Sequence, residues 1–210
     1  MESDRAQLAA RLADGIEALQ LALPDDAQAR LIDYIDLLAR WNRAYNLTAV
    51  RDPPDMIPRH LLDSLAVLPF LRGATLADLG SGAGLPGIPL AIARPAMQVT
   101  LIDSNGKKAR FLREAVRTLP LPNVRVEQLR AQDASGHFDC ITARAFAGLA
   151  EMLAWGGHLL ARGGRWLALK GRVEPGELAV PPGFRVLAVH PLNVPGITGA
   201  RNLIEVVPAR

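Results

Sequence analysis

The 210 residues are half hydrophobic and 21% charged, which is the balance of a folded globular chain and excludes an intrinsically disordered one. The single cysteine, Cys140, excludes an internal disulfide and a zinc site built from several thiolates. The chain opens without the basic and apolar regions of a secretory signal, and no apolar run approaches the roughly 18 residues of a membrane span. We therefore expect a cytoplasmic protein with no membrane partner.

The net charge of +3 is unevenly distributed along the chain. Residues 1–72 carry eight arginines and eleven acidic residues, a net charge of −3, whereas residues 73–210 carry sixteen basic and ten acidic residues, a net charge of +6. The basic excess in the second segment predicts an anionic partner there.

The first 72 residues have the apolar spacing of helices. Apolar residues three and four positions apart predict helices over about 8–19, 28–41 and 55–68. Pro24 ends the first helix, and Asp25 is expected to cap the second, with Gln28 in the capping-box position. We interpret residues 1–72 as an N-terminal helical module.

From Gly73 onward, short apolar runs alternate with helical segments. Strands are expected at 76–79, 99–103, 124–129, 138–142 and 165–170. The helices between them are expected to start near Pro86, after Ser104 as the cap, and at 149, which predicts a parallel α/β sheet over residues 73–210. Two closing strands, 185–190 and 202–207, have no helix between them and indicate an antiparallel hairpin at one edge.

A glycine-rich loop follows the first strand, with four glycines in residues 80–87. Such a loop can serve packing alone, but it also lets the backbone approach a ligand at the carboxyl ends of the strands. Residues 82–87 match the dinucleotide fingerprint Gly-x-Gly-x-x-Gly. Residues 78–84, Asp-x-Gly-x-Gly-x-Gly, resemble the first motif of S-adenosylmethionine-dependent methyltransferases.

Asp78 favours the second of these cofactors. Its carboxylate would repel a pyrophosphate, whereas it could help to hold the sulfonium or ammonium group of S-adenosylmethionine, directly or through water. Asp103, at the end of the next strand, could accept hydrogen bonds from the ribose hydroxyls of either cofactor. Both tyrosines lie within residues 1–72, so the α/β segment lacks a Tyr-Lys pair for hydride transfer.

Six motifs then make a family resemblance visible. They are residues 41–48 (Trp-Asn-Arg-Ala-Tyr-Asn-Leu-Thr), 59–64 (Arg-His-Leu-Leu-Asp-Ser), 82–89 (Gly-Ala-Gly-Leu-Pro-Gly-Ile-Pro), 103–112 (Asp-Ser-x-x-Lys-Lys-x-x-Phe-Leu), 144–146 (Arg-Ala-Phe) and 169–171 (Leu-Lys-Gly). Together they resemble the bacterial RsmG (GidB) family, over about residues 31–207. The first motif is not shared by methyltransferases in general, which makes the resemblance specific.

The resemblance implies a Rossmann-like class I methyltransferase fold, with S-adenosylmethionine as its cofactor. It also implies methylation of N7 of a guanine in the 530 loop of 16S rRNA, at position 527 in the usual numbering, with 16S rRNA or a small ribosomal subunit precursor as partner. No obligate protein partner is inferred, and the spacing of the four histidines favours no metal site. A methyltransferase for a small molecule or a protein, and a non-catalytic S-adenosylmethionine-binding module, are the alternatives.

The family's roles are carried over position by position. The cofactor-binding residues implied are Asp78, Gly80, Gly82, Leu85, Asp103, Ala131, Gln132 and Arg144. Residues 130–133 depart from the family's pattern, so Asp133 is a further candidate for the adenine amino group. Arg144 and Lys170 are the expected catalytic residues, and the expected RNA-binding residues are Asn46, His60, Lys107, Arg110, Lys170 and Arg201. Of these, Lys107 and Arg110 are chosen for their shared helix face, and Lys170 and Arg201 for their places at strand ends, which face the ligand side of a parallel sheet.

Transfer to guanine N7 makes few chemical demands. The atom carries no proton in the neutral base, so the reaction needs orientation and no general base. Arg144 and Lys170 would donate to guanine O6 or to its phosphate. Lys107 and Arg110 share one helix face with Arg113 and Arg117, which is either an ordinary solvated face or a surface that follows phosphates.

Overall fold

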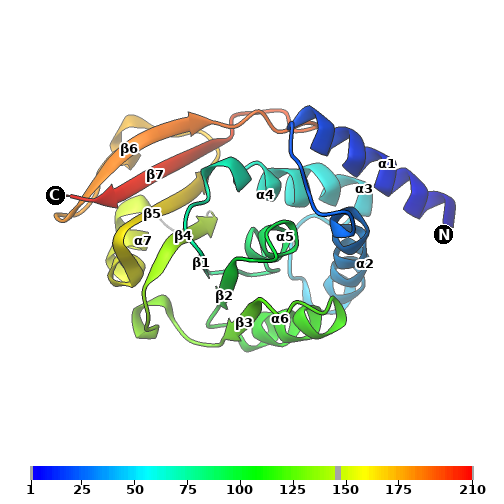
Figure 1. Cartoon of the computed structure of the whole chain (residues 1–210), viewed down its shortest axis with the longest axis horizontal. Coiled ribbons are helices and arrows are strands. Elements are labelled where there is room, and N and C mark those ends of the chain that lie inside the picture. Colours follow the sequence, from blue (N-terminus) through cyan, green and yellow to red (C-terminus); the bar gives the residue numbers. More distant parts are fainter. Residues whose placement is uncertain (1, 145–147, 210) are drawn as a thin grey trace.

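The computed structural model describes residues 2–144 and 148–209. Within them, seven strands form one sheet in the order β3-β2-β1-β4-β5-β7-β6 (Figure 1). The first five strands run parallel, and β7 pairs antiparallel with both β5 and β6. The strands are β1 (Thr75–Leu79), β2 (Gln98–Ile102), β3 (Val124–Glu127), β4 (Phe138–Arg144), β5 (Leu160–Lys170), β6 (Phe184–Pro191) and β7 (Asn202–Pro208).

This topology confirms the predicted fold, a mostly parallel sheet with an antiparallel hairpin at one edge. The structure adds that β7, the last strand of the chain, lies between β5 and β6, so that β6 forms the edge. The strand β5 begins at Leu160, five residues before the predicted start at Arg165.

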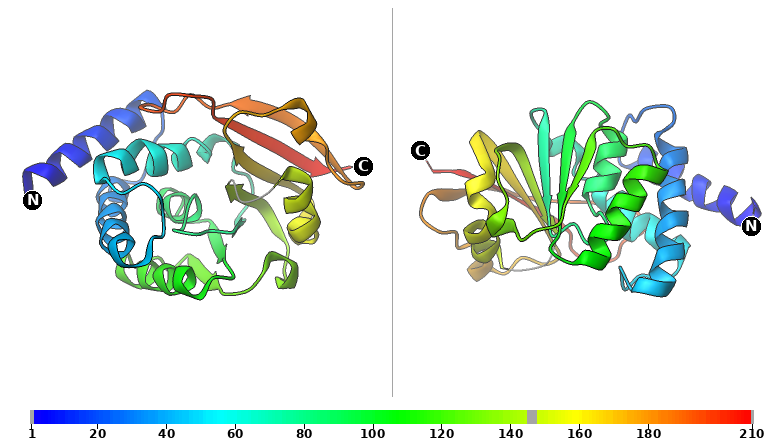
Figure 2. Two further views of the ribbon diagram at one scale, coloured as in Figure 1. Left: turned by 180° about the vertical axis from the view of Figure 1, so that it is seen from behind. Right: turned by 90° about the horizontal axis from the view of Figure 1, so that it is seen from below.

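Helices cover both faces of the sheet (Figure 2). They are α1 (Glu2–Ala18), α2 (Ala27–Tyr45), α3 (Pro53–Met56), α4 (Asp63–Leu65), α5 (Gly87–Ala93), α6 (Gly106–Thr118) and α7 (Leu149–Gly156). A π-helical segment (Ile57–Leu62) joins α3 to α4, and 3₁₀ turns lie at Leu68–Phe70, Ala131–Asp133, Gly157–Leu159 and Pro175–Leu178. The predicted third helix is therefore a run of α-, π- and α-helix over residues 53–65.

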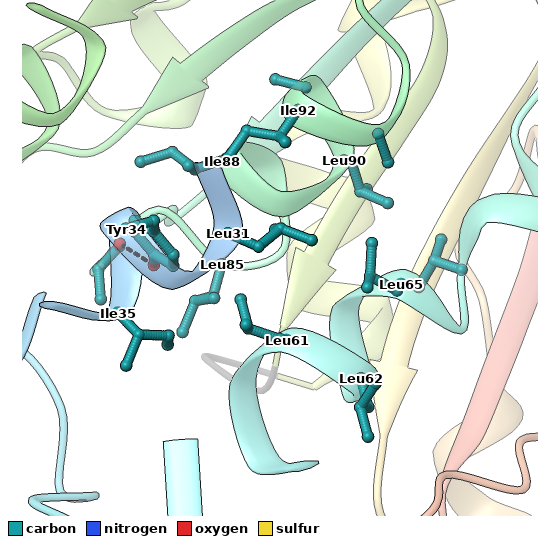
Figure 3. Close-up of a cluster of buried hydrophobic side chains, with 14 of the residues drawn as sticks. Leu31, Tyr34, Ile35, Leu61, Leu62, Leu65, Leu85, Ile88, Leu90 and Ile92 are labelled. Atoms are coloured by element: carbon teal, nitrogen blue, oxygen red, sulfur yellow. Dashed lines mark hydrogen bonds between the residues drawn. The ribbon is translucent and has the colours of Figure 1, made fainter. Parts of the chain in front are cut away.

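Side-chain alternation along the strands divides the core between the two faces of the sheet. Leu76 and Leu101 belong to one cluster, whereas Ala77 and Leu79 belong to a second cluster with α7. The first cluster also contains side chains of α2, α4 and α5, several of which are drawn in Figure 3. Residues from both sides of position 72 thus pack into one core.

Two predicted helix caps are wrong. The start of α6 is capped by Asn105, whose side-chain oxygen accepts the backbone N–H groups of Lys107 and Lys108 at 3.0 and 3.2 Å. Asn105 has the extended backbone that aims a capping side chain at the first turn, and Ser104 lies one residue too early. The N-cap of α2 is Asp26 and not Asp25, and its side chain makes no capping hydrogen bond.

Replacing Asn105 by alanine is expected to lower the free energy of unfolding by about 1 kcal/mol, because two amides of the first turn of α6 lose their acceptor. Ser104→Ala is the matched control and should leave stability within about 0.5 kcal/mol of the unmodified protein. Urea unfolding of both variants measures the difference. Equal losses in the two variants would contradict the assignment of the cap.

Candidate active site

The glycine turn after β1 is held against the end of β2. Gly80, Gly82 and Gly84 have φ values of +66°, +60° and +88°, which only glycine adopts without strain. The backbone N–H groups of Gly80 and Ser81 both donate to the carbonyl of Ile102, at 2.9 and 3.2 Å. The turn therefore lies at the carboxyl ends of β1 and β2, where open α/β sheets bind ligands.

Asp78 supports this turn from its buried side. Its fully buried carboxylate accepts hydrogen bonds from the N–H of Gly87 at 3.1 Å and from the hydroxyl of Thr142 at 3.0 Å. Burial raises the pKa of Asp78 to about 7, although these hydrogen bonds favour the charged form. A Cβ atom at Gly87 would lie 2.8 Å from an oxygen of this carboxylate, so the helix α5 can begin here only with glycine.

Asp103 is fixed on the opposite side of the turn. One carboxylate oxygen accepts the N–H of Gly82 and the other accepts the N–H of Asn105, both at 2.8 Å. The ammonium of Lys108 lies 3.9 Å from the first oxygen. Because its rotamer is set by two backbone donors, the carboxylate has a defined direction before any ligand arrives.

A cavity of about 380 Å³ opens at the ends of β1, β2 and β3, beside Asp103. It is lined by Gly80, Ile102, Asp103, Ser104, Lys108, Leu129, Arg130, Ala131, Gln132 and Trp155. Its volume is in the range of small-molecule sites. Its lining combines apolar side chains, among them Ile102, Leu129 and Trp155, with one oriented carboxylate, which suits a nucleoside that offers ribose hydroxyls and a flat base. The residues present therefore fit the adenosine part of S-adenosylmethionine.

Four of the predicted cofactor residues line this cavity, namely Gly80, Asp103, Ala131 and Gln132. Four others lie elsewhere. Gly82 does not line the cavity but donates a hydrogen bond to Asp103, which does. Asp78 and Leu85 are buried on the inner side of the turn. Arg144 lies in a second cavity. The sequence analysis missed Trp155, which carries no motif signal.

The helix α2 holds the glycine turn from outside. The fully buried hydroxyl of Tyr34 donates to the carbonyl of Ala83 at 2.7 Å, the dashed contact in Figure 3. Burial raises the pKa of the Tyr34 phenol, which keeps it protonated as a donor. Tyr34 was missed in the sequence, where it stands beside an apolar stripe and has no distinguishing signal.

A second cavity, of about 370 Å³, opens at the ends of β4 and β5. It is lined by Thr48, Ala49, Val50, Arg59, His60, Asp63, Arg144, Leu169, Lys170, Gly171 and Arg201. The structure thus brings together four residues predicted for RNA binding or catalysis, which are His60, Arg144, Lys170 and Arg201. Lys170 also pairs with Glu177 at 3.2 Å.

Asp63 organises the charges of this second cavity. Its two carboxylate oxygens accept separately from Arg144 at 3.4 Å and from Arg201 at 3.2 Å. Burial raises the pKa of Asp63, and the two guanidinium groups oppose that shift. Asp63 stands in the motif at residues 59–64, but its role was missed because its partners are remote in the sequence.

His60 is buried between a hydroxyl and a guanidinium. Its Nε2 lies 2.9 Å from the hydroxyl of Thr48, and its Nδ1 lies 3.5 Å from Arg144. Burial, together with the charge of Arg144, lowers the pKa of His60 to about 4. We assign the neutral tautomer in which Nε2 donates to Thr48 and Nδ1 accepts from Arg144, because arginine can only donate.

Three predicted RNA-binding residues lie outside both cavities. Asn46 ends α2 in a left-handed conformation and faces solvent, with its side-chain oxygen 3.5 Å from Arg51. Lys107 and Arg110 are exposed on α6, so the predicted polar face of that helix is confirmed. Residues 145 and 146, from the motif that begins with Arg144, lie outside the described residues.

Asn42, which the sequence analysis did not single out, shapes the loop after α2. Its side chain donates to the carbonyl of Val50 at 3.1 Å and accepts the N–H of Thr48 at 2.9 Å. These two bonds bring the loop to the wall of the second cavity.

Two further findings concern residues 2–144 and 148–209. They contain no group of three or more histidine, cysteine or acidic side chains that could hold a metal ion. None of their helices is long and apolar enough to cross a membrane.

The fold resembles those of several solved methyltransferases. The crystal structure of TrmN from Thermus thermophilus superimposes with a TM-score of 0.54 at 22% identity, over 73% of this chain and 53% of that one. The glycopeptide N-methyltransferase MtfA in complex with S-adenosylmethionine superimposes with a TM-score of 0.56 at 13% identity, over 70% of this chain and 94% of that one. These likenesses identify the fold as the Rossmann-like methyltransferase fold.

Sequence comparisons identify the family. The family model GidB, described as rRNA small subunit methyltransferase G, matches residues 27–204. The protein named ribosomal RNA small subunit methyltransferase G from Xanthomonas campestris pv. campestris (strain 8004) is 55% identical over 202 residues, 95% of this chain and 94% of that protein. The protein of the same name from Stenotrophomonas maltophilia (strain R551-3) is 55% identical over 205 residues, 96% and 95% of the two chains. The chain therefore belongs to the ribosomal RNA small subunit methyltransferase G family, whose members are S-adenosylmethionine-dependent methyltransferases.

Proposed function

We propose that this protein transfers the methyl group of S-adenosylmethionine to N7 of a guanine in 16S rRNA, at position 527 in the 530 loop. The observation that carries the RNA substrate is the charge of the second cavity, whereas the guanine, its N7 atom and its position are what the family resemblance implies. Arg59, Arg144, Lys170 and Arg201 all line it, and Asp63 is the one acidic residue among its described lining residues. A polyanion is the partner that such a cavity favours. With such a substrate, free or in a small-subunit precursor, the protein would work in the bacterial cytoplasm.

The first cavity would hold the cofactor, which supplies an electrophilic methyl group on its sulfonium. Asp103 would accept from the ribose hydroxyls, because its oriented carboxylate lines the cavity. Ala131 and Gln132 would contact the adenine, and Gly80 would let the backbone pass close to the ligand. Asp78 and Leu85 support the turn from the buried side.

The second cavity is suited to orienting a base and poorly suited to removing a proton. His60, with a pKa of about 4, is a weak base whose Nδ1 already faces Arg144. Asp63 is committed to two arginines. Guanine N7 needs no deprotonation, so Arg144 and Lys170 could act by donating to O6 or to the phosphate and so aligning N7 with the methyl group.

Replacing Asp103 by alanine is expected to weaken S-adenosylmethionine binding by about 10- to 150-fold, the cost of losing hydrogen bonds to a charged acceptor. Calorimetric titration measures the affinity, and circular dichroism checks the fold. Glu127→Gln, at the end of β3 and outside the lining of the cavity, is the charge-matched control and should bind normally. Unchanged affinity in Asp103→Ala would overturn the role of Asp103.

A substrate in which 7-deazaguanosine replaces the target guanosine should accept no methyl group, because only the nucleophilic atom is missing. RNA affinity should stay within about twofold, since O6 and the phosphates are kept. Incorporation of a radiolabelled methyl group, with filter binding of the same RNA, measures both. Methylation of the 7-deaza nucleotide would show that another atom is the acceptor.

Replacing Lys107 and Arg110 together by glutamine should flatten the salt dependence of RNA binding. Each lost phosphate contact lowers the slope of log K against log salt by about 0.7 to 0.9. Arg185→Gln, exposed on the edge strand β6, is the control and should keep the full slope. If the double variant also keeps the full slope, these two side chains are only solvated.

A further inference from the structure

Three aromatic rings form a continuous series from the core to the surface. Phe111 of α6 is fully buried, and its ring centroid lies 5.7 Å from that of Trp41, at an interplanar angle of 60°. Trp41 in turn stacks on Tyr45 at 5.1 Å and 28°. Tyr45 is 36% exposed. Trp41 therefore stacks on one face of the Tyr45 ring, while about a third of the Tyr45 surface stays exposed to solvent.

The register of two helices places this ring. Arg30, near the start of α2, donates to the carbonyls of Leu119 and Pro120 just after α6, at 2.9 and 3.0 Å. Trp41, near the end of α2, contacts Phe111 in the first half of α6. The two helices are therefore antiparallel neighbours, as Figure 2 shows in its right-hand view. Tyr45, one turn beyond Trp41, lies toward the N-terminal turn of α6.

Residues near this position line both cavities. Lys108, in the first turn of α6, lines the first cavity, which is the proposed cofactor cavity. Thr48, three residues after Tyr45, lines the second cavity, which we call the cationic cavity because of Arg59, Arg144, Lys170 and Arg201. A ligand that extends out of the second cavity toward the start of α6 would pass the exposed part of Tyr45.

The neighbourhood of the ring along α6 and the loop after α2 is cationic. Arg51, which lies 3.5 Å from the side-chain oxygen of Asn46, and Lys107 and Arg110 are all exposed there. Glu114, on the same helix as Lys107, is neutralised by Arg117 at 2.8 Å. A rigid aromatic face among arginines and lysines is the arrangement by which proteins bind unpaired bases, because the ring stacks on a base and the cations attract the phosphates.

We propose that Tyr45, supported from behind by Trp41, is a stacking platform for an unpaired RNA base next to the nucleotide in the cationic cavity. This inference rests on the proposed function, since it needs an RNA substrate. The platform recognises the flat face of a base and contributes affinity and register with little base specificity. The surface thus separates two tasks: Lys107 and Arg110 contact phosphates, and Tyr45 contacts a base.

The test compares Tyr45→Leu with Tyr45→Phe. Leucine keeps apolar volume and helix propensity but removes the π face, whereas phenylalanine keeps that face. We expect Tyr45→Leu to weaken binding of an RNA hairpin that carries the 530-loop sequence by about 5- to 150-fold, as loss of one base–aromatic stack predicts. Tyr45→Phe should bind within about twofold of the unmodified protein. Fluorescence anisotropy measures both affinities.

Two further measurements separate stacking from other effects. The slope of log K against log salt should be the same in Tyr45→Leu and the unmodified protein, because stacking releases no counterions. S-adenosylmethionine affinity should also be unchanged, which shows that the variant is folded. In the unmodified protein, 2-aminopurine placed in turn at each unpaired loop position should be quenched on binding at one position or more, and that quenching should be lost in Tyr45→Leu.

The outcomes distinguish this inference from the proposed function. If the unmodified protein neither binds nor methylates the RNA, the proposed function fails and the platform fails with it. If it binds and methylates the RNA but Tyr45→Leu binds equally well, only the platform is overturned. Equal weakening in Tyr45→Phe and Tyr45→Leu would also overturn it, because the hydroxyl and not the ring face would then make the contact.

Discussion

The buried carboxylate of Asp78 is the point at which the sheet, the glycine turn and α5 are joined. A charge in the interior is tolerated only when donors satisfy it, and here the donors are Gly87 at the start of α5 and Thr142 on β4. The glycine turn that follows Asp78 is held in addition by the N–H groups of Gly80 and Ser81, which donate to the carbonyl of Ile102 at the end of β2. The floor of the cofactor cavity, and the direction of Asp103 above it, follow from this one arrangement.

The helical segment before the sheet supports the turn beside the first cavity and supplies walls of the second. Tyr34 holds the outer side of the glycine turn, and Asn42 holds the loop that carries Thr48. The π-helical segment and the start of α4 then supply His60 and Asp63 to the cationic cavity. Removing residues 1–72 would therefore remove walls of the second cavity.

Asp63 allows two arginines to share one small cavity. Arg144 and Arg201 would repel each other there without a carboxylate between them, and each takes one oxygen of Asp63. Two positive charges held in place by one negative charge leave a net attraction for phosphate and for carbonyl oxygens. The same contact keeps Asp63 from serving as a base, which agrees with an acceptor atom that carries no proton.

The sequence by itself determined the order of the main elements of the fold and pointed to four residues that line the first cavity. Short apolar runs marked the strands, and an acid at the end of the second run marked Asp103, because both signals are local. It also pointed to Arg144 through a family resemblance and to Lys170 and Arg201 through their places at strand ends, but without their partners. Only the tertiary structure decided that Asn105 and not Ser104 caps α6, that β7 enters the sheet beside β5, and that Tyr34 bonds to Ala83. Above all, it brought Asp63 to arginines 81 and 138 residues away. Local patterns encode which face of an element is apolar, whereas the partner of a buried charge depends on how whole elements pack.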